Sequence, residues 1–161
     1  MTEPAQVEAA LRASQLLREF TDVGLKILAE VAIARSVGRG AYAFKAGEES
    51  QALSFVVSGT LHLIPADGGA ALGEMGAGDC VGGLSLLVGG EHVVSALAAT
   101  DVGLFEISRP AFEGMKKTHP RTALKLTLAL AQDLAERLKE TKGPLREFLI
   151  WQIGKRQAEG H

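Results

Sequence analysis

The chain has 161 residues, of which 47% are hydrophobic and 22% charged, and its net charge is -2. This composition excludes a disordered chain, which combines low hydrophobicity with high net charge. It also disfavours a nucleic-acid binder that works through bulk positive charge. The single cysteine, Cys80, excludes an intrachain disulfide and is typical of a reducing compartment. Because no apolar run reaches the roughly 18 residues of a membrane span, and the acidic start does not resemble a secretory signal, we expect a cytoplasmic protein without membrane contact.

Residues 1–36 are expected to form N-terminal helices. Apolar side chains recur at helical spacing from Val7 to Phe20. Thr21 and Asp22 are predicted to cap a second helix. The apolar residues of that second helix are Leu25, Ile27, Leu28, Val31 and Ile33.

Residues 37–108 carry most of the glycines of the chain. Of its 19 glycines, those from Gly38 to Gly90 stand at short intervals among Val, Leu and Ile. Glycine weakens helices and permits positive φ, so this stretch predicts short strands joined by tight turns. Residues 55–57 and 61–64 are predicted as two strands around a turn at 58–60. Residues 93–98 and 102–107 are predicted as two more, around 99–101.

Residues 109–142 predict a hinge followed by a long helix. A short helix is expected at 111–117, and Pro120 is expected to open a helix at about 121–140. The apolar side chains of this helix cover an arc of roughly 200°, about twice what packing on one surface requires. A second protomer or the apolar tail, residues 143–161, is therefore expected to cover the surplus. The expected dimer or partner surface consists of Leu124, Leu128, Ala131, Ala135 and Leu138.

Three segments carry a more specific pattern. They are residues 40–48 with 53–61, residues 72–87, and residues 99–109 with Phe112. In this order and spacing they resemble the cyclic nucleotide-binding domain family, from about Ser14 to Lys139. The resemblance implies a mainly β fold with flanking α-helices. This fold is a double-stranded β-helix, a jelly-roll-like β-roll of eight strands, with N-terminal helices and a long C-terminal helix.

The resemblance also implies a phosphate-binding cassette at residues 78–95. In the family, the amides that open a short helix face the cyclic phosphate, a Glu holds the ribose, and an Arg forms a fork to the phosphate. Here Gly83 stands at the Glu position and His92 at the Arg position. The ligand-binding residues implied by position are Gly82, Gly83, Leu84, Ser85, His92, Val93 and Val94. A lid over the base is assigned in the same way to Phe148 and Trp151.

The expected function is a stand-alone regulatory module whose cyclic nucleotide binding is weak or lost. It would act through an unidentified protein partner or by homodimerisation through the long helix. The alternative is a genuine sensor of cAMP, cGMP or a cyclic dinucleotide with altered contacts. No cofactor is expected besides such a ligand.

Two other classes are less favoured by the residues. A cupin-like enzyme would need a β-roll that holds a metal through several histidines. The four histidines do not form a two-His spacing with a following carboxylate, and no Gly-x-Ser-x-Gly is present, so no catalytic or metal-binding residues are expected. The segment after Glu140 lacks the polar, base-reading face of a recognition helix, so no DNA binding is expected.

Overall fold

The computed structural model describes residues 4–140 and confirms the β-roll with flanking helices. The helices are α1 (Pro4–Arg12), a 3-10 turn (Gln15–Leu17), α2 (Asp22–Val31), α3 (Gly83–Leu87), α4 (Arg109–Thr118) and α5 (Pro120–Glu140). The strands are β1 (Ile33–Val37), β2 (Tyr42–Phe44), β3 (Ala52–Ser58), β4 (Leu61–Pro65), β5 (Gly73–Met75), β6 (Cys80–Val81), β7 (Val94–Ala98) and β8 (Val102–Ser108). The chain divides into two compact units, Met1–Thr127 and Leu128–His161, and the first contains the whole roll.

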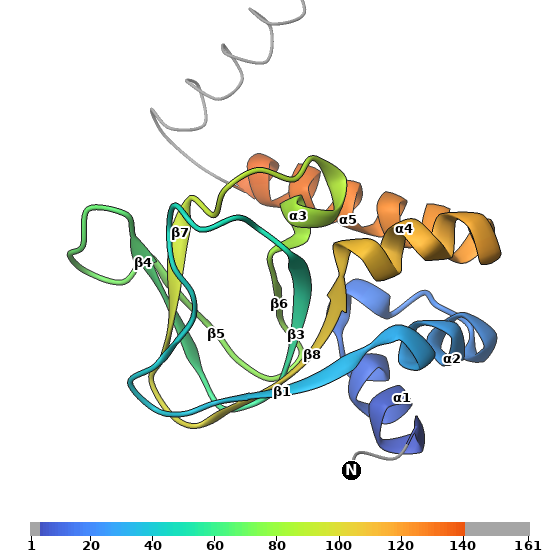
Figure 1. Cartoon of the computed structure of the whole chain (residues 1–161), viewed down its shortest axis with the longest axis horizontal. Helices are drawn as coiled ribbons and strands as arrows, with labels where there is room; N and C mark the ends of the chain where they lie inside the picture. Colours follow the sequence, from blue (N-terminus) through green and yellow to red (C-terminus); the bar gives the residue numbers. More distant parts are fainter. Residues whose placement is uncertain (1–3, 141–161) are drawn as a thin grey trace, which may run out of the picture. The chain divides into compact units, whose positions relative to one another are not determined.

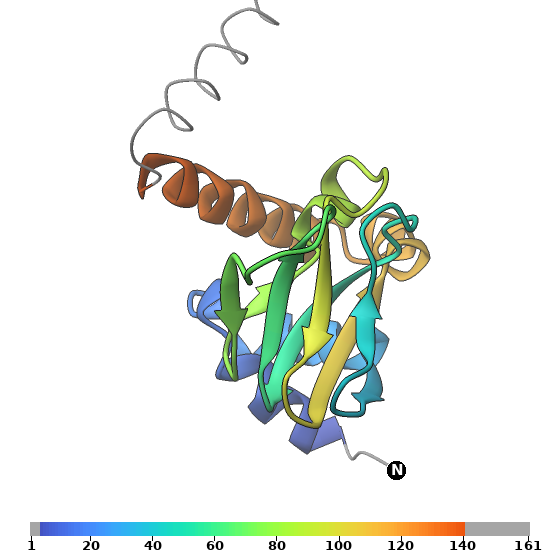
Figure 2. The ribbon, with the colours of Figure 1, turned by 90° about the vertical axis from the view of Figure 1, so that its left-hand side faces the viewer.

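The strands form two antiparallel sheets of four strands each (Figure 1). One sheet has the order β1-β8-β3-β6 and the other β2-β7-β4-β5. Sequence neighbours β1 and β2 therefore lie in different sheets, as do β3 and β4, and β7 and β8. Figure 2 shows the strands of the roll side by side. The predicted strands at 55–57, 61–64, 93–98 and 102–107 are confirmed as parts of β3, β4, β7 and β8.

The interior of the roll is an aliphatic core. Strand alternation turns one face of each sheet inward, and the inward side chains are small or branched. The buried members of this core are Val37, Ala43, Val56, Leu61, Val81, Ala96, Ala98, Val102 and Leu104, with Phe44, Leu63 and Met75 packed against them.

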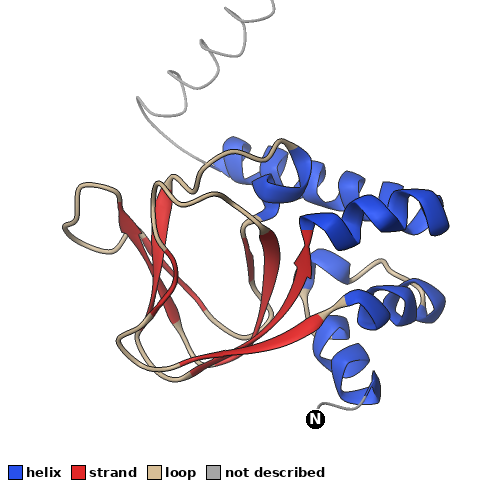
Figure 3. Ribbon diagram, viewed as in Figure 1, coloured by secondary structure: helices blue, strands red, loops and turns tan. Residues whose placement is uncertain are grey.

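A second set of buried side chains lies on the outer face of the β1-β8-β3-β6 sheet. Leu53 is paired with Ile107, and Phe55 with Phe105, in the register of β3 and β8. These four residues alternate with the inward-facing ones and are nevertheless buried. Figure 3 shows helices α1, α2 and α4 gathered on this side of the sheet. The helices contribute further buried residues, namely Leu11, Leu17, Leu25, Leu28, Phe112 and Met115.

The N-terminal segment differs from its prediction in two places. The first helix ends at Arg12 rather than continuing to Phe20, and buried Ser14 has an extended backbone. The second helix begins as predicted, because the hydroxyl of Thr21 accepts a hydrogen bond from the N–H of Gly24 at 3.3 Å. The placement of Ile33 in that helix is wrong, since α2 ends at Val31 and Ile33 opens β1.

Helix α2 ends before Ile33 because the following residues pair with β8 as strand β1. Five residues of β1 pair with β8, from Ile33 opposite Glu106 to Val37 opposite Val102. A β-branched side chain such as that of Ile33 suits a strand better than a helix. The long-range pairing with β8 therefore overrides the helical spacing.

The C-terminal helices begin close to their predicted positions. Ser108 caps α4 by accepting a hydrogen bond from the N–H of Ala111 at 3.1 Å, and α5 begins at Pro120. Leu124 and Leu128 are each 59% exposed. Ala131 and Ala135 are exposed as well, whereas Leu138 is half-buried. The predicted lid residues Phe148 and Trp151 lie outside the described residues. No helix between residues 4 and 140 combines the length and apolar character that crossing a membrane requires.

Candidate functional site

The turn at Gly82 and helix α3 form the first arm of the cassette-like segment, and this arm has the backbone that the resemblance implies. Gly82 has a φ of +82°, which favours glycine, and helix α3 begins at the next residue. The turn before it is fixed because the carboxylate of Asp79 accepts a hydrogen bond from the N–H of Gly76 at 3.0 Å. Leu86 anchors the helix and is only 2% exposed. Leu84 and Ser85 belong to α3, and their side chains lie outside the described part of the chain.

The second arm, residues 90–95, is tied to the loop between β2 and β3. Four hydrogen bonds of 2.8–2.9 Å join the two segments: Gly47 N–H to His92 O, His92 N–H to Glu48 O, Ser50 N–H to Gly90 O, and Ala46 N–H to Ser95 Oγ. Glu49 and Glu91 also form a β-bridge. Three of the four bonds use only backbone groups, so the arm is held largely independently of its side chains.

The imidazole of His92 is stacked on the ring of Phe44. The two ring centroids are 3.8 Å apart and the planes are inclined by 13°. Burial lowers the pKa of His92 below its ordinary value, and the nearby carboxylate of Glu48 opposes this effect. The imidazole is therefore neutral at neutral pH. It contributes stability that is present at neutral pH and is lost as the pH falls through its ordinary range, because the unfolded chain then binds the proton more readily.

The predicted ligand residues thus fall into two groups. Gly82 and Gly83 lie at the turn and at the start of α3, where the resemblance places the phosphate. On the other arm, His92 faces Phe44, Val93 is 74% exposed, and Val94 is the half-buried first residue of β7. A neutral, stacked imidazole is chemically unlike the fixed cationic fork of an Arg.

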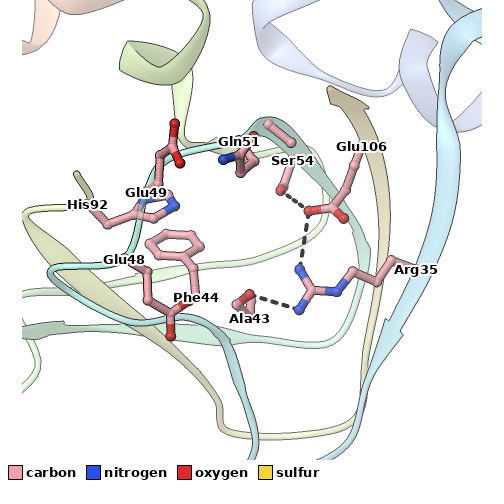
Figure 4. A pocket seen from close by; sticks show the side chains of 10 residues that line it. Arg35, Ala43, Phe44, Glu48, Glu49, Gln51, Ser54, His92 and Glu106 are labelled. Atoms are coloured by element: carbon pink, nitrogen blue, oxygen red, sulfur yellow. Dashed lines mark hydrogen bonds and ion pairs between the residues drawn. The ribbon is translucent and has the colours of Figure 1, made fainter. Parts of the chain in front are cut away.

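Next to this stack lies a cavity of about 260 Å³ that the sequence did not reveal (Figure 4). Its lining residues are Arg35, Ala43, Phe44, Glu48, Glu49, Gln51, Ala52, Ser54, His92 and Glu106. Of the predicted ligand residues whose side chains the structure describes, only His92 is among them. Neither Gly82 nor Gly83 lines the cavity.

Glu106, Ser54 and Arg35 form a polar network on one side of the cavity. The Ser54 hydroxyl donates to Glu106 Oε2 at 2.6 Å, and Arg35 Nη1 lies 3.4 Å from the same oxygen. Arg35 also donates from Nη2 to the carbonyl of Ala43 at 2.8 Å. One signal could have revealed the network. Val102, Leu104 and Glu106 alternate along one strand, so the carboxylate shares the inward face with two core residues and requires partners.

Comparisons with known proteins agree with this architecture. The family model described as "Cyclic nucleotide-binding domain" matches residues 34–119, more than half of the chain. Among curated proteins, the chain is 29% identical over 113 residues to a lysophospholipase of Aspergillus fumigatus. That match covers 66% of this chain but only 7% of the lysophospholipase, so the chain spans a small part of that protein.

Two solved structures show the same fold. A cyclic nucleotide-binding domain from Methylobacillus flagellatus has a TM-score of 0.74 at 20% identity, covering 88% of this chain and 86% of its own. A variant of the regulatory subunit of a cAMP-independent protein kinase A from Trypanosoma brucei has a TM-score of 0.68 at 22% identity, covering 93% of this chain and 51% of its own. With the family model spanning β1 to the end of α4, the chain belongs to the cyclic nucleotide-binding domain family.

Proposed function

We propose that this domain is a regulatory module that binds cyclic nucleotides weakly or not at all, acts through protein contacts and performs no catalysis. The observation that carries the proposal is the state of His92. At the position where the resemblance places a phosphate-binding Arg, the chain has a neutral imidazole stacked on Phe44. Gly83, at the position of the ribose-binding Glu, has no side chain with which to make the second contact.

A relative with the same fold supports this interpretation. The Trypanosoma brucei kinase is described as cAMP-independent, and a triple variant of its regulatory subunit, which includes a change of threonine to arginine, is bound to cAMP. Independence of cAMP in a protein of this fold therefore has a precedent, and an introduced Arg accompanies cAMP binding there.

The test is a calorimetric titration of the domain with cAMP, cGMP and cyclic dinucleotides at pH 6 and pH 7.5. We expect no saturable heat below about 1 mM, a dissociation constant that corresponds to roughly -4 kcal/mol. Because burial lowers the pKa of His92, we also expect no strengthening at pH 6. A micromolar dissociation constant for any of these ligands would contradict the proposal.

A micromolar dissociation constant would instead support the second candidate function, a cyclic nucleotide sensor with altered contacts. One observation favours that candidate. The turn at Gly82 and helix α3 persist, so the backbone amides at the start of the helix are still present. An increase in affinity on going from pH 7.5 to pH 6 would then assign the phosphate contact to protonated His92.

We further propose that a second copy of the domain docks on α5. Leu124, Leu128, Ala131, Ala135 and Leu138 follow one another at alternating spacings of four and three residues, which keeps them on one face of the helix. This spacing is that of the contact positions in a two-stranded coiled coil. The exposure of Leu124 and Leu128 supports the proposal.

The variant Leu128→Glu is expected to weaken dimerisation by about tenfold or more, because half-burial of a Leu contributes about 0.75–1.5 kcal/mol and the dimer buries one from each copy. Sedimentation at several protein concentrations measures this effect. Val23→Glu is the matched control, since Val23 is an apolar residue of α2 that is 70% exposed. A wild-type mass of one chain at every concentration would contradict the dimer.

A further inference from the structure

The cavity beside the Phe44–His92 stack is small, with a volume of about 260 Å³. This volume lies just below the range of about 300–1,000 Å³ that drug-sized ligands occupy, so the cavity suits a small ligand. Its lining comes from β1, β2, β3, β8, the loop between β2 and β3, and the segment before β7. Segments distant in sequence thus contribute side chains to one small space.

One side of the cavity presents a carboxylate that is already oriented. The side chain of Glu106 is only 20% exposed, and its Oε2 is held by the hydroxyl of Ser54 and the guanidinium of Arg35. An ionised carboxylate has about four acceptor positions, so these contacts leave acceptor capacity. The shorter hydrogen bond of Arg35 goes to the carbonyl of Ala43, so the guanidinium is shared between two acceptors.

The other side of the cavity is also acidic, and it includes an aromatic ring. Figure 4 shows Glu48, Glu49, His92 and Phe44 on one side, and Glu106 and Arg35 on the other. Glu48 and Glu49 are exposed. Among the described residues, the charged side chains that line the cavity are three carboxylates and one guanidinium, and His92 is neutral at neutral pH. The lining therefore has an excess of two negative charges.

We propose that this cavity binds a small linear aliphatic diamine. One ammonium group donates to Glu106, whose carboxylate is fixed by Ser54 and Arg35. The other donates to Glu48 or Glu49 at the opposite side, and the alkyl chain between them lies along Phe44. Charge-assisted hydrogen bonds of this kind are the stronger ones in proteins, and an alkyl chain gains by leaving water for an aromatic face. An anionic ligand is disfavoured by the excess of carboxylates.

Calorimetry with 1,4-diaminobutane at pH 7.5 tests this inference. We expect saturable binding with one site and a dissociation constant below about 1 mM. The single cation 1-aminobutane should bind at least tenfold more weakly, because it reaches only one side of the cavity. Glu106→Gln should weaken the diamine by about tenfold, and so should Glu48→Gln combined with Glu49→Gln on the exposed side.

The matched control is Glu91→Gln. Glu91 is exposed, forms a β-bridge with Glu49 and does not line the cavity, so this variant removes the same charge nearby without changing the lining. We expect it to keep the wild-type affinity within twofold. Equal losses in Glu91→Gln and in the Glu48 and Glu49 double variant would overturn the inference, because bulk charge would then explain the binding.

The pH dependence provides a second readout. Because burial lowers the pKa of His92, protonation of its imidazole is expected only as the pH falls below the ordinary pKa of histidine; the added positive charge in the lining should then weaken the diamine. In the part of the chain that the structure describes, Glu48, Glu49, Glu106 and Arg35 are the other charged groups that line the cavity. If Glu106→Gln does not fold, the double variant on the exposed side still decides the question. No saturable heat with the wild-type domain up to about 1 mM diamine would overturn the inference.

Discussion

The double variant Gly83→Glu and His92→Arg is expected to bind cAMP at least 100-fold more tightly than the wild-type domain. The two substitutions supply the side chains that the resemblance places at the ribose and at the phosphate. A hydrogen bond to a charged group contributes about 1.5–3 kcal/mol, and each 1.4 kcal/mol is a factor of about ten in affinity. Two such contacts therefore raise the affinity by about two orders of magnitude or more.

The backbone is compatible with both substitutions. Gly83 is the first residue of α3, where a helical backbone suits any L residue and an acidic group is favoured by the helix dipole. His92 is held by backbone hydrogen bonds to Gly47 and Glu48, which do not depend on its side chain. The pKa of His92 is lowered by burial, and the carboxylate of Glu48 lies close enough to oppose this effect, so we expect Glu48 to attract an arginine at this position as well.

Calorimetric titration with cAMP measures the gain, and the two single variants should each supply about half of it in free energy. The control is His62→Arg, which makes the same chemical change on β4, outside the cassette-like segment. This control should bind no better than the wild-type domain. A folded double variant without improved affinity would show that the tie between residues 90–95 and the loop at 46–50 blocks the site.

The β-roll was implied by the family resemblance, whereas helix starts and turns were accessible from the sequence because their signals are local. Thr21 is a predicted helix cap and Ser108 an observed one. Each hydroxyl accepts a hydrogen bond from an N–H in the first turn of its own helix. The signal at Pro120, where α5 begins, is also local. The ring of proline fixes φ near the helical value, and its missing N–H has no partner to lose at a helix start. Glycines at 59, 78 and 82 have positive φ and mark turns wherever they occur. Each of these features acts within a few residues.

Ile33 shows where local signals stop being sufficient. Its spacing from Leu25, Ile27 and Leu28 fits a helix, but its partner in the structure is Glu106 on β8. The sequence contains both residues without showing that they meet. The pairing of β1 with β8 joins residues about 70 positions apart, and a periodic pattern holds no information about such a contact.

The candidate site was only partly predictable for the same reason. The positions of Gly83 and His92 follow from the resemblance, whereas the stacking of His92 on Phe44 follows from the pairing of β2 with β7. The network around Glu106 combines Ser54 and Arg35, which are 52 and 71 residues away in sequence. Strand alternation indicates that Glu106 faces inward, but only the folded roll identifies its partners.

Gly59→Ala is expected to destabilise the domain by about 3 kcal/mol or more, which lowers the melting temperature by about 6–12 °C. Gly59 lies in the turn between β3 and β4 and has a φ of +80°. A non-glycine residue with this conformation costs about 1–2 kcal/mol. In addition, a Cβ atom here would overlap the backbone carbonyl oxygen of Asp101. Backbone atoms cannot rotate away as a flexible side chain can, so the turn itself must shift.

Gly40→Ala separates the two causes. Gly40 has a φ of +85°, but a Cβ atom there would meet nothing within 4 Å, so this variant reports the backbone strain alone. We expect a loss of about 1–2 kcal/mol for it. Urea denaturation and thermal melting of both variants measure the difference, which is the cost of moving the Asp101 carbonyl. Equal losses would contradict the clash and show that this carbonyl adjusts freely.

A large difference is expected because the turn around Gly59 is bonded to the turn between β7 and β8. The Thr60 amide donates to the hydroxyl of Thr100 at 3.0 Å, and the Ala99 amide donates to the carbonyl of Thr60 at 2.9 Å. Asp101 is held as well, since its carboxylate accepts from the amide of Arg39 at 2.9 Å. A shift at Gly59 therefore disturbs both turns and the β1–β2 connection. The absence of a side chain at Gly59 therefore allows its turn to pack directly against the backbone of Asp101.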